Sequence, residues 1–399
     1  MRTQLNARSD VTGPLSGVRI LELAGRGPGP FAGMLLADMG AEVVRVDRPN
    51  ESPRAEVPDQ RLELTGRGRR SVVIDLKHDE GRETLLRLAQ RADALYEGYR
   101  PGVVERLGVG PDHCRARNPR LVYARATGWG QRGPLAQFAG HDINYIALAG
   151  ALEPIGRAGA PPTVPLNLIG DFAGGGQLLA FGIVCGILEA RSSGQGQVID
   201  AAMVDGASLL MAMFHGRRSN GTWRDERGSN YIDSGAPYYD VYETKDRKFV
   251  SVGAIEAKFQ RELFSRLGLA TDEFAIPVVR ADWPRLRDRL EGIFRTRTRE
   301  EWTLHFQSTD SCFAPVLALG EVSAHPHHQA RQSFVSVDGV SQPAPAPRFS
   351  RTKEHIVRRP PRSGEHSQDV LRDWGFSDDE VLRLCASGAV TQSEVESPK

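Results

Sequence analysis

The runs VRILELA at residues 18–24 and AEVVRV at 41–46 decide the fold predicted for this chain. Short, mostly apolar runs bounded by turn residues are typical of strands that are buried on both faces. Between them lie a glycine-proline turn at 25–30 and a helical pattern of apolar residues at 31–39. A strand, a helix and a second strand in this order form a βαβ unit, which predicts a parallel, Rossmann-like sheet.

The same alternation of strand and helix patterns continues along the chain. Further strands are predicted at 71–76, 94–96, 121–126 and 198–202, and helices at 79–92, 178–190 and 205–213. The fold class that follows is α/β, with a large domain built around one parallel sheet.

A dinucleotide-binding turn is the alternative interpretation of 25–30, with Asp47 close to the position of a ribose-binding acid. The sequence GRGPGP does not keep the GxGxxG spacing, and Pro28 and Pro30 remove two amide donors that a pyrophosphate needs. Asp47 is also followed at once by Arg48, which suits a phosphate better than a ribose hydroxyl. The sequence therefore argues against a dinucleotide site.

The pattern of the chain changes near residue 236. Alternating runs at 238–243 and 248–252 predict a hairpin, and helices are predicted after it at 257–267, 283–295 and 299–307. We therefore expect a large domain at 1–215, a polar linker at 216–235, a small α+β domain at 236–319, and a segment at 320–399 that returns to complete the large domain. The motif SDDE at 377–380 predicts a capping box before the last helix.

Composition argues against several kinds of partner. The 399 residues carry a net charge of +1, so bulk electrostatics predicts neither nucleic acid nor an anionic membrane surface. The four cysteines form no CxxC pair, which fits a reducing compartment. The polar start at 1–11 lacks an apolar signal core, and the longest apolar stretch, 178–188, is too short to span a bilayer. We expect a cytoplasmic protein without membrane insertion.

A histidine and an aspartate, 30 positions apart, each lie in a glycine-rich loop before an apolar segment. His141 lies in GHDINY at 140–145, and Asp171 lies in LIGDFAGGG at 168–176. The simpler interpretation is that the His-Asp pair caps a helix and that the glycines form turns. The alternative is that an imidazole and a carboxylate on two loops hold a substrate between two proton-transfer groups.

Four cations fall at or just after predicted strand ends: Arg48, Lys77, Arg100 and Arg106. Ligands of parallel α/β sheets collect at the carboxyl ends of the strands. A single arginine there is usually a solvated loop residue. Three arginines and a lysine would form a socket for an anion with several phosphates, such as coenzyme A.

Several longer motifs resemble those of the α-methylacyl-CoA racemases, a group within the family III CoA-transferase (CaiB/BaiF) superfamily. They are LAGRGPGP at 23–30, EGYRPG at 97–102, TGWGQ at 127–131 and the two loops that contain His141 and Asp171. The resemblance runs from Gly13 to Val390 and implies that group's architecture, a homodimer of two interlocked subunits. It also implies racemisation of 2-methylacyl-CoA thioesters at C2, in fatty acid metabolism, with no cofactor because CoA is part of the substrate.

The resemblance assigns roles to particular residues. His141 and Asp171 are the two proton-transfer groups, and Asp142 and Glu256 support them. The implied CoA contacts are Arg48, Ile74, Asp75, Leu76, Lys77, Gly98, Tyr99, Arg100, Arg106, Gly140, His141, Asp142, Ile143, Asn144 and Tyr145. Met203, Met211 and Met213 match a methionine-rich acyl surface, although methionines in a helix are usually core filling. Glu256 lies in the predicted small domain, so it is a candidate to act from the partner subunit.

Inversion of a thioester at C2 requires two groups. The α-proton is a weak acid at neutral pH, so exchange needs a base within hydrogen-bond reach and stabilisation of the enolate oxygen. A single base returns the proton to the face that it left, whereas His141 on one face and Asp171 on the other would invert the centre. Main-chain N–H groups around Asp142 are the candidates for the oxyanion site. For Asp142 and Glu256 the simpler interpretation is a surface carboxylate.

Two other functions stay open at this point. A CoA transferase of the same superfamily would use Asp171 as a nucleophile that forms a mixed anhydride, and His141, which such transferases generally lack, argues against it. A non-catalytic acyl-CoA binding protein would need Arg48, Arg100 and Arg106 but not the His-Asp pair. The sequence HPHH at 325–328 has no Cys, Asp or Glu cluster at ligand spacing, so we expect no metal site.

Overall fold

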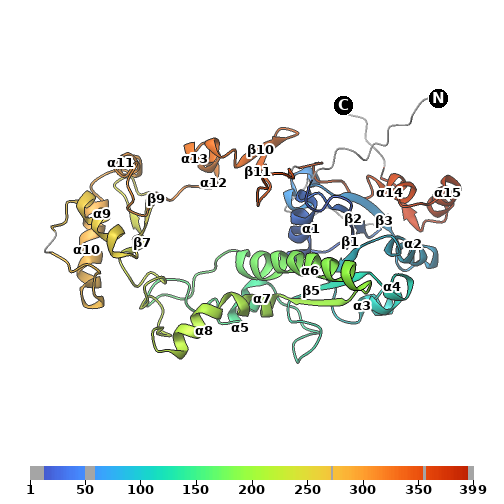
Figure 1. Cartoon of the computed structure of the whole chain (residues 1–399), viewed down its shortest axis with the longest axis horizontal. Coiled ribbons are helices and arrows are strands. Elements are labelled where there is room, and N and C mark those ends of the chain that lie inside the picture. The colour runs from blue at the N-terminus through green and yellow to red at the C-terminus, as the bar shows by residue number, and fades with distance from the viewer. Residues whose placement is uncertain (1–12, 50–58, 271–272, 354–355, 394–399) are drawn as a thin grey trace. The chain divides into compact units, whose positions relative to one another are not determined.

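The computed structural model describes residues 13–49, 59–270, 273–353 and 356–393 and divides into two compact units (Figure 1). Unit 1 comprises Met1–Ala149, Leu166–Leu210 and Gln332–Lys399, and unit 2 comprises Gly150–Pro165 and Met211–Arg331. Each unit has its own apolar core.

Unit 1 is built on a seven-stranded sheet. Its strands are β1 (Arg19–Leu23), β2 (Glu42–Asp47), β3 (Arg70–Ile74), β4 (Ala94–Glu97), β5 (Val122–Thr127), β6 (Val198–Ala202) and β12 (Val390–Thr391). They lie in the order β12-β3-β2-β1-β4-β5-β6; β1 to β6 are parallel, and β12 runs antiparallel to β3. The predicted Rossmann-like parallel sheet is confirmed. The edge strand β12 was not predicted, because two residues carry no periodic pattern.

The strand order reverses between β1 and β4. The chain runs outward from β1 through β2 to β3, and then from β4 through β5 to β6 on the other side. In open parallel sheets, ligands bind in the crevice outside the carboxyl ends of the strands at such a reversal. Here the crevice is flanked by residues 24–27 after β1 and residues 98–102 after β4.

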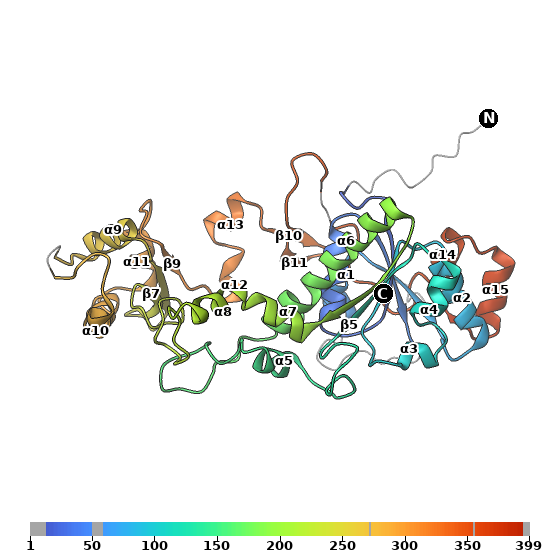
Figure 2. The same ribbon diagram turned by 60° about the horizontal axis from the view of Figure 1, so that its bottom comes forward.

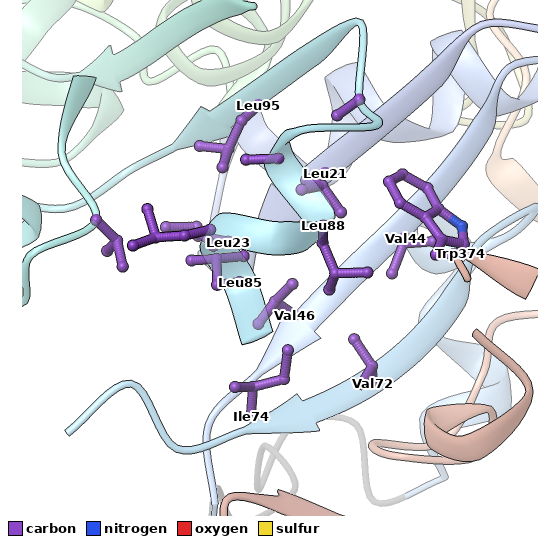
Figure 3. Close-up of a cluster of buried hydrophobic side chains, with 14 of the residues drawn as sticks. Leu21, Leu23, Val44, Val46, Val72, Ile74, Leu85, Leu88, Leu95 and Trp374 are labelled. Carbon is purple, nitrogen blue, oxygen red and sulfur yellow. The ribbon is translucent and has the colours of Figure 1, made fainter. Parts of the chain in front are cut away.

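Helices cover both faces of this sheet (Figure 2). One face carries α1 (Pro28–Asp38) and α6 (Leu178–Ser193), and the other carries α2 (Asp79–Ala89), α4 (Pro111–Arg117), α14 (Ser367–Asp373) and α15 (Asp378–Ala386). Figure 3 shows the second core, where Leu21, Val44 and Leu95 of three strands lie beside Leu88 of α2 and Trp374. Trp374 is fully buried, so the C-terminal segment closes this core.

The shorter elements of unit 1 lie mostly in the connections. They are η1 (Gln60–Leu62), η2 (Leu64–Gly66), α3 (Val103–Arg106), α5 (Asp142–Leu148), η3 (Leu168–Gln177), α7 (Met203–Leu210), β10 (Phe334–Val337) and β11 (Val340–Pro343). The capping box predicted before α15 is confirmed. The Ser377 hydroxyl accepts the N–H of Glu380 at 3.3 Å, and the Glu380 carboxylate accepts the N–H of Ser377 at 2.7 Å.

Two predicted boundaries are wrong. Helix α1 begins at Pro28, inside the predicted turn, because proline fits the first helical position, where its missing N–H is not needed. The predicted helix at 205–213 is two helices, α7 and α8 (Ala212–Ser219), and α8 extends into the predicted linker.

The segment η3 is a π-helix that leads directly into α6. It contacts α1, α5, α6 and α7. Its contact with α7 is made by main chain: a Cβ added to Gly206 would lie 1.9 Å from the carbonyl oxygen of Gly174. π-Helical turns are rare and are found mostly at functional sites.

The continuous helical stretch Leu168–Ser193 is long and apolar enough to cross a membrane, judged by length and composition only. The predicted apolar stretch at 178–188 is shorter because the glycine-rich residues before it show no helical pattern. The criterion is also met by core helices, and this helix packs Leu179, Ile183 and Ile187 into the core on one face of the sheet.

Unit 2 contains a three-stranded antiparallel sheet covered by helices. Its elements are α8, β7 (Tyr239–Glu243), β8 (Phe249–Gly253), α9 (Ala257–Leu267), η4 (Arg280–Asp282), α10 (Trp283–Phe294), α11 (Arg299–His305), β9 (Phe313–Pro315), α12 (Leu319–Val322) and α13 (Pro326–Ala330). The core includes Tyr242, Leu263, Leu286, Phe294 and Trp302. The predicted hairpin corresponds to β7 and β8.

Unit 2 is larger than the small domain predicted at 236–319, since it also holds Gly150–Pro165 and the predicted linker. Ion pairs join these segments. Arg227 lies 2.8 Å from the carboxylate of Glu153, and Arg157 pairs with the buried carboxylate of Asp240. Pairs between residues this far apart in the chain leave no periodic signal in the sequence.

The substitution Gly206→Ala tests the close contact of η3 with α7. The new methyl group would collide with the main chain of Gly174, so we expect a loss of about 1–3 kcal/mol in the free energy of unfolding, measured by circular dichroism. Gly216→Ala in α8 is the control, because nothing lies within 4 Å of its Cβ position and alanine favours a helix by about 1 kcal/mol. If Gly206→Ala were as stable as the control, η3 and α7 would not be packed in this way.

Candidate active site

Asp171 lies at the carboxyl end of β1, where the strand order reverses. Gly27, which follows β1, has φ +65°, and a Cβ added to it would lie 3.1 Å from Oδ2 of Asp171. A side chain at position 27 would therefore displace the carboxyl group. The predicted proton-transfer residue lies in the crevice where an open parallel sheet binds its ligand.

The surroundings of Asp171 favour its protonated form. The side chain is half-buried, and burial raises the pKa of the Asp171 carboxyl above its ordinary value, helped by the charge of Asp142. The side-chain amide of Asn167 donates to Oδ2 of Asp171 at 3.1 Å, and this bond and the charge of His141 act in the opposite direction. A carboxyl group with this balance exchanges protons more readily near neutral pH than an exposed aspartate does.

Asp142 is the residue that joins the two predicted loops. Its side chain is buried, and its Oδ2 accepts the main-chain N–H of Gly170 at 2.6 Å and that of Asp171 at 2.7 Å. These N–H groups belong to the first turn of η3 and have no partner within that helix. The surface interpretation of Asp142 is wrong, and the hydrogen bond that joins it to Asp171 runs to the main chain.

His141 is the N-cap residue of α5, and its imidazole is exposed. Its main-chain N–H donates to Oδ1 of Asn144 at 3.0 Å. The interpretation of His141 as a helix cap is thus correct, since the residue is the N-cap of α5. It does not conflict with a chemical role, because an exposed ring at a helix start stays open to a ligand.

Tyr145 fixes the loop before His141. Its hydroxyl donates to the carbonyl of Gly140, and its ring meets the indole of Trp129 edge to face at 4.8 Å between centroids. A Cβ on Gly140 would lie 2.7 Å from this ring, so only glycine allows the approach. Burial and the charges of Asp171 and Asp142 raise the pKa of Tyr145 to about 12, which keeps the hydroxyl protonated as a donor.

Several residues that the resemblance assigns to CoA binding follow strands β2, β3 and β4, at the edge of the sheet formed by the carboxyl ends of the strands. The guanidinium of Arg48, after β2, lies 5.6 Å from the ring centroid of Tyr99, after β4. Lys77, Arg100 and Arg106 are exposed, whereas Ile74 and Leu76 are buried. The cations are therefore accessible to an anionic ligand, and the two apolar residues are part of the core.

Buried charges support the loop after β4, and the sequence prediction did not include them. Glu97 is fully buried, accepts the N–H of Tyr99 at 2.6 Å and pairs with Arg125 of β5 at 3.0 Å. Arg125 also pairs with Glu105 of α3 at 2.8 Å. Burial raises the pKa of Glu97 to about 7, against the N–H of Tyr99 and the charge of Arg125. The sequence offered one signal for this support, since the predicted buried strand at 94–96 is followed directly by the charged residue Glu97.

The other predicted residues lie elsewhere. Glu256 is the N-cap residue of α9 in unit 2, and its side chain is exposed. Met203 is buried beneath η3, where a Cβ on Gly175 would lie 2.9 Å from its Cγ, while Met213 is exposed in unit 2. No group of three or more potential metal ligands occurs in the part of the chain that the structure describes.

The chain belongs to a known family. Residues 15–367 match the model of CoA-transferase family III, and the chain is a member of that family. The Mycobacterium tuberculosis protein Rv3272, a solved structure, superposes with a TM-score of 0.74 at 26% identity, over 90% of this chain and 99% of that one.

Two curated relatives are more specific in name. The chain is 43% identical to the mouse protein named alpha-methylacyl-CoA racemase, over 96% of this chain and 99% of the relative. The human protein of the same name is also 43% identical, with the same coverage. The family resemblance expected from the motifs is confirmed.

The substitution Asp171→Asn tests the electrostatic state of the site without a substrate. A carboxyl whose pKa is raised by folding contributes stability below its unfolded pKa and loses it as the pH rises through the folded value. Asparagine stays neutral, so we expect Asp171→Asn to raise Tm at pH 7 and to leave it unchanged near pH 3.

Asp246→Asn is the control of opposite sign. The Thr244 hydroxyl and the N–H of Arg299 hold the pKa of the Asp246 carboxyl below its ordinary value, so its loss should lower Tm at pH 7. A fall in Tm at pH 7 for Asp171→Asn would contradict the assignment of a disfavoured charge to Asp171.

Proposed function

We propose that this protein interconverts the two C2 epimers of 2-methylacyl-CoA thioesters by proton transfer through an enolate. The observation that carries the proposal is that His141 and a half-buried Asp171 are joined through Asp142 at the crevice of the sheet. The 43% identity to two proteins named alpha-methylacyl-CoA racemase supports the same reaction.

The two groups have complementary roles. In one direction the neutral imidazole of His141 removes the proton from C2, and the carboxylic acid of Asp171 returns one to the opposite face. In the other direction the carboxylate of Asp171 is the base and the imidazolium of His141 is the acid. Each cycle therefore starts with one group protonated and the other not, which the raised pKa of Asp171 favours.

The developing enolate oxygen needs a hydrogen-bond donor. In the first turn of α5, the N–H of His141 donates to the side chain of Asn144, and the N–H groups of Asn144 and Tyr145 donate to the carbonyl of His141. The N–H of Asp142 is our candidate donor to the thioester oxygen. The buried Asp142 carboxylate has a separate role, because it fixes η3.

The CoA moiety provides most of the binding energy in this proposal. Arg48, Lys77 and Arg100 in the loops after the strands, together with Arg106 in α3, bind its phosphates. Arg48 lies against the ring of Tyr99. Glu97 and Arg125 hold the main chain of this loop in place. No further cofactor is needed, because the thioester itself acidifies C2. We place the reaction in fatty acid metabolism in the cytoplasm.

Glu256 is proposed to orient the imidazole of His141. Its exposed carboxylate at the start of α9 is free to reach a ligand or a second subunit. Met203, Met211 and Met213 remain candidates for the acyl surface. Because Met203 is buried, its proposed role is limited to packing beneath η3.

We also propose a homodimer with interlocked subunits. On unit 1, α6 exposes Phe181 at 65% and Leu188 at 71%, and α7 exposes Leu209 at 62%. Large apolar side chains that are exposed to this extent are candidates for an interaction surface. A second copy of the chain is the partner that the family resemblance implies.

The reaction is tested with purified protein and (2R)- or (2S)-2-methylacyl-CoA in D₂O, with succinate added to a parallel reaction. We expect deuterium at C2 and approach to equal amounts of the epimers from either side, measured by NMR and chiral chromatography. No succinyl-CoA should form. New succinyl-CoA without deuterium at C2 would instead identify a CoA transferase with Asp171 as nucleophile. Binding without either reaction would leave an acyl-CoA binding protein.

The dimer is tested by charge placed on the apolar face. Leu188→Asp in α6 should lower dimer affinity at least tenfold in analytical ultracentrifugation, whereas Leu382→Asp, on α15 and 60% exposed, should have no effect. Interlocking predicts in addition that two differently tagged preparations form mixed dimers only after unfolding and refolding together. A monomeric protein, or rapid exchange of subunits, would contradict the proposal.

A further inference from the structure

A buried polar cluster lies under the first turn of α1. The side chains of Arg69 and Glu22 are each 1% exposed, and Nε of Arg69 lies 2.7 Å from Oε2 of Glu22. The hydroxyl of Tyr96, on the neighbouring strand β4, lies in the same cluster. Their apolar neighbours on this face of the sheet include Ala32 and Leu36.

This cluster donates hydrogen bonds to two carbonyls at the start of α1. The Tyr96 hydroxyl donates to the carbonyl of Gly29 at 3.2 Å, and Nη2 of Arg69 donates to the carbonyl of Pro30. A third bond, from Nη1 of Arg69 to the carbonyl of Thr65 at 2.5 Å, ties the guanidinium to η2. A Cβ on Gly33 would lie 2.3 Å from the Tyr96 hydroxyl, so α1 rests directly on the cluster.

The same first turn is the surface against which Asp171 and η3 pack. Gly27 faces the Asp171 carboxyl, and the main chain of Pro28 lies 2.7 Å from the Cβ position of Gly176. In addition, Phe31 at the end of this turn stacks on Phe172, the residue after Asp171, at 4.7 Å between ring centroids. A shift of this turn would therefore move η3 and change how deeply the Asp171 carboxyl is buried.

A buried ion pair by itself contributes little to the stability of a fold. Removing two charges from water costs several kcal/mol, and apolar residues of the same volume often serve as well. A guanidinium with three fixed partners does, however, hold main-chain atoms in one place, because its planar geometry leaves few alternatives. Those atoms here are the carbonyl of Thr65 in η2 and the carbonyl of Pro30, which lies three residues after Gly27, the residue that faces Asp171.

We propose that Glu22, Arg69 and Tyr96 are positioning residues that fix the first turn of α1 and thereby hold the Asp171 carboxyl in its reacting position. The inference rests on the proposed role of Asp171 in proton transfer. None of the three side chains contacts the substrate in this proposal. Tyr96 acts through the carbonyl of Gly29 and Arg69 through that of Pro30, while Glu22 acts by holding the guanidinium of Arg69.

The substitution Tyr96→Phe tests the cluster with the least disturbance, because it removes one hydroxyl and keeps the ring. Tyr123→Phe is a matched control. Tyr123 is equally buried on the adjacent strand β5, and its hydroxyl donates to the carbonyl of Val109 at 3.1 Å, but its side chain lies in the core on the other face of the sheet. Both variants lose one buried hydrogen bond and should lose similar Tm.

We expect Tyr96→Phe to lower kcat for C2 exchange about tenfold or more while KM for the acyl-CoA changes less than about twofold, since small misplacements of a reacting group are costly. Its kcat–pH profile should shift at the limb that reports Asp171. Tyr123→Phe should leave kcat and the profile unchanged. Equal kcat losses in the two variants, or an effect of Tyr96→Phe on KM alone, would overturn the proposal.

A second measurement needs no activity. If Tyr96→Phe lets the Asp171 carboxyl move toward solvent, the gain in Tm at pH 7 from Asp171→Asn should shrink in the Tyr96→Phe background and persist in the Tyr123→Phe background. Unchanged gains in both backgrounds would show that the cluster does not act on Asp171. Because this cycle is independent of turnover, it separates failure of the positioning role from failure of the proposed reaction.

Discussion

One buried carboxylate, that of Asp142, accepts two main-chain N–H groups at the start of η3, and the candidate site depends on this contact. The bonds from Gly170 and Asp171 join α5 to η3 and so connect the loop of His141 to that of Asp171. They also supply the partners that the first turn of a helix lacks. With the carboxylate in place, a glycine-rich segment adopts a π-helix, and Asp171 lies against Gly27 at the reversal of the strand order. The negative charge of Asp142 is at the same time one of the causes that raise the pKa of Asp171.

The two sides of the crevice are supported by different buried charges. Under α1, the pair of Glu22 and Arg69 contacts the turn that faces Asp171. Beside β4, Glu97 and Arg125 hold the loop that carries Tyr99 and Arg100. Each pair supports a residue with a proposed chemical role, the half-buried Asp171 in the first case and the exposed Arg100 in the second, and a buried pair of this kind adds little to stability by itself. Asp171 and the proposed CoA socket thus rest on separate supports, so under the proposed function a change in the first support should affect turnover and a change in the second should affect binding.

Much of this arrangement was predictable from the sequence, and the failures have identifiable causes. The strands from β1 to β6 were predicted because buried apolar runs between turn residues are a local signal. The His141 and Asp171 loops were predicted from glycine-rich motifs, and the family match confirms the resemblance that those motifs suggested. The π-helix was missed, because glycines disfavour a helix and the packing of Gly174 against Gly206 that permits it is a tertiary contact. The roles of Glu22, Arg69 and Glu97 were missed for the same reason, since a charge inside an apolar run gives no indication of its partner.

In the proposed reaction two bases act on opposite faces of one carbon atom, so variants that lack one of the two bases give the sharpest test. His141→Ala and Asp171→Asn would each be incubated in D₂O with (2R)- and, separately, (2S)-2-methylacyl-CoA, and deuterium at C2 would be measured together with the epimer ratio. Racemisation should fall at least about a hundredfold in both variants, as expected for loss of a general acid–base group. Each variant should still exchange deuterium into one epimer with retention, and the favoured epimer should be opposite in the two variants. Variants that treat both epimers alike, or that still racemise at the wild-type rate, would contradict the assignment.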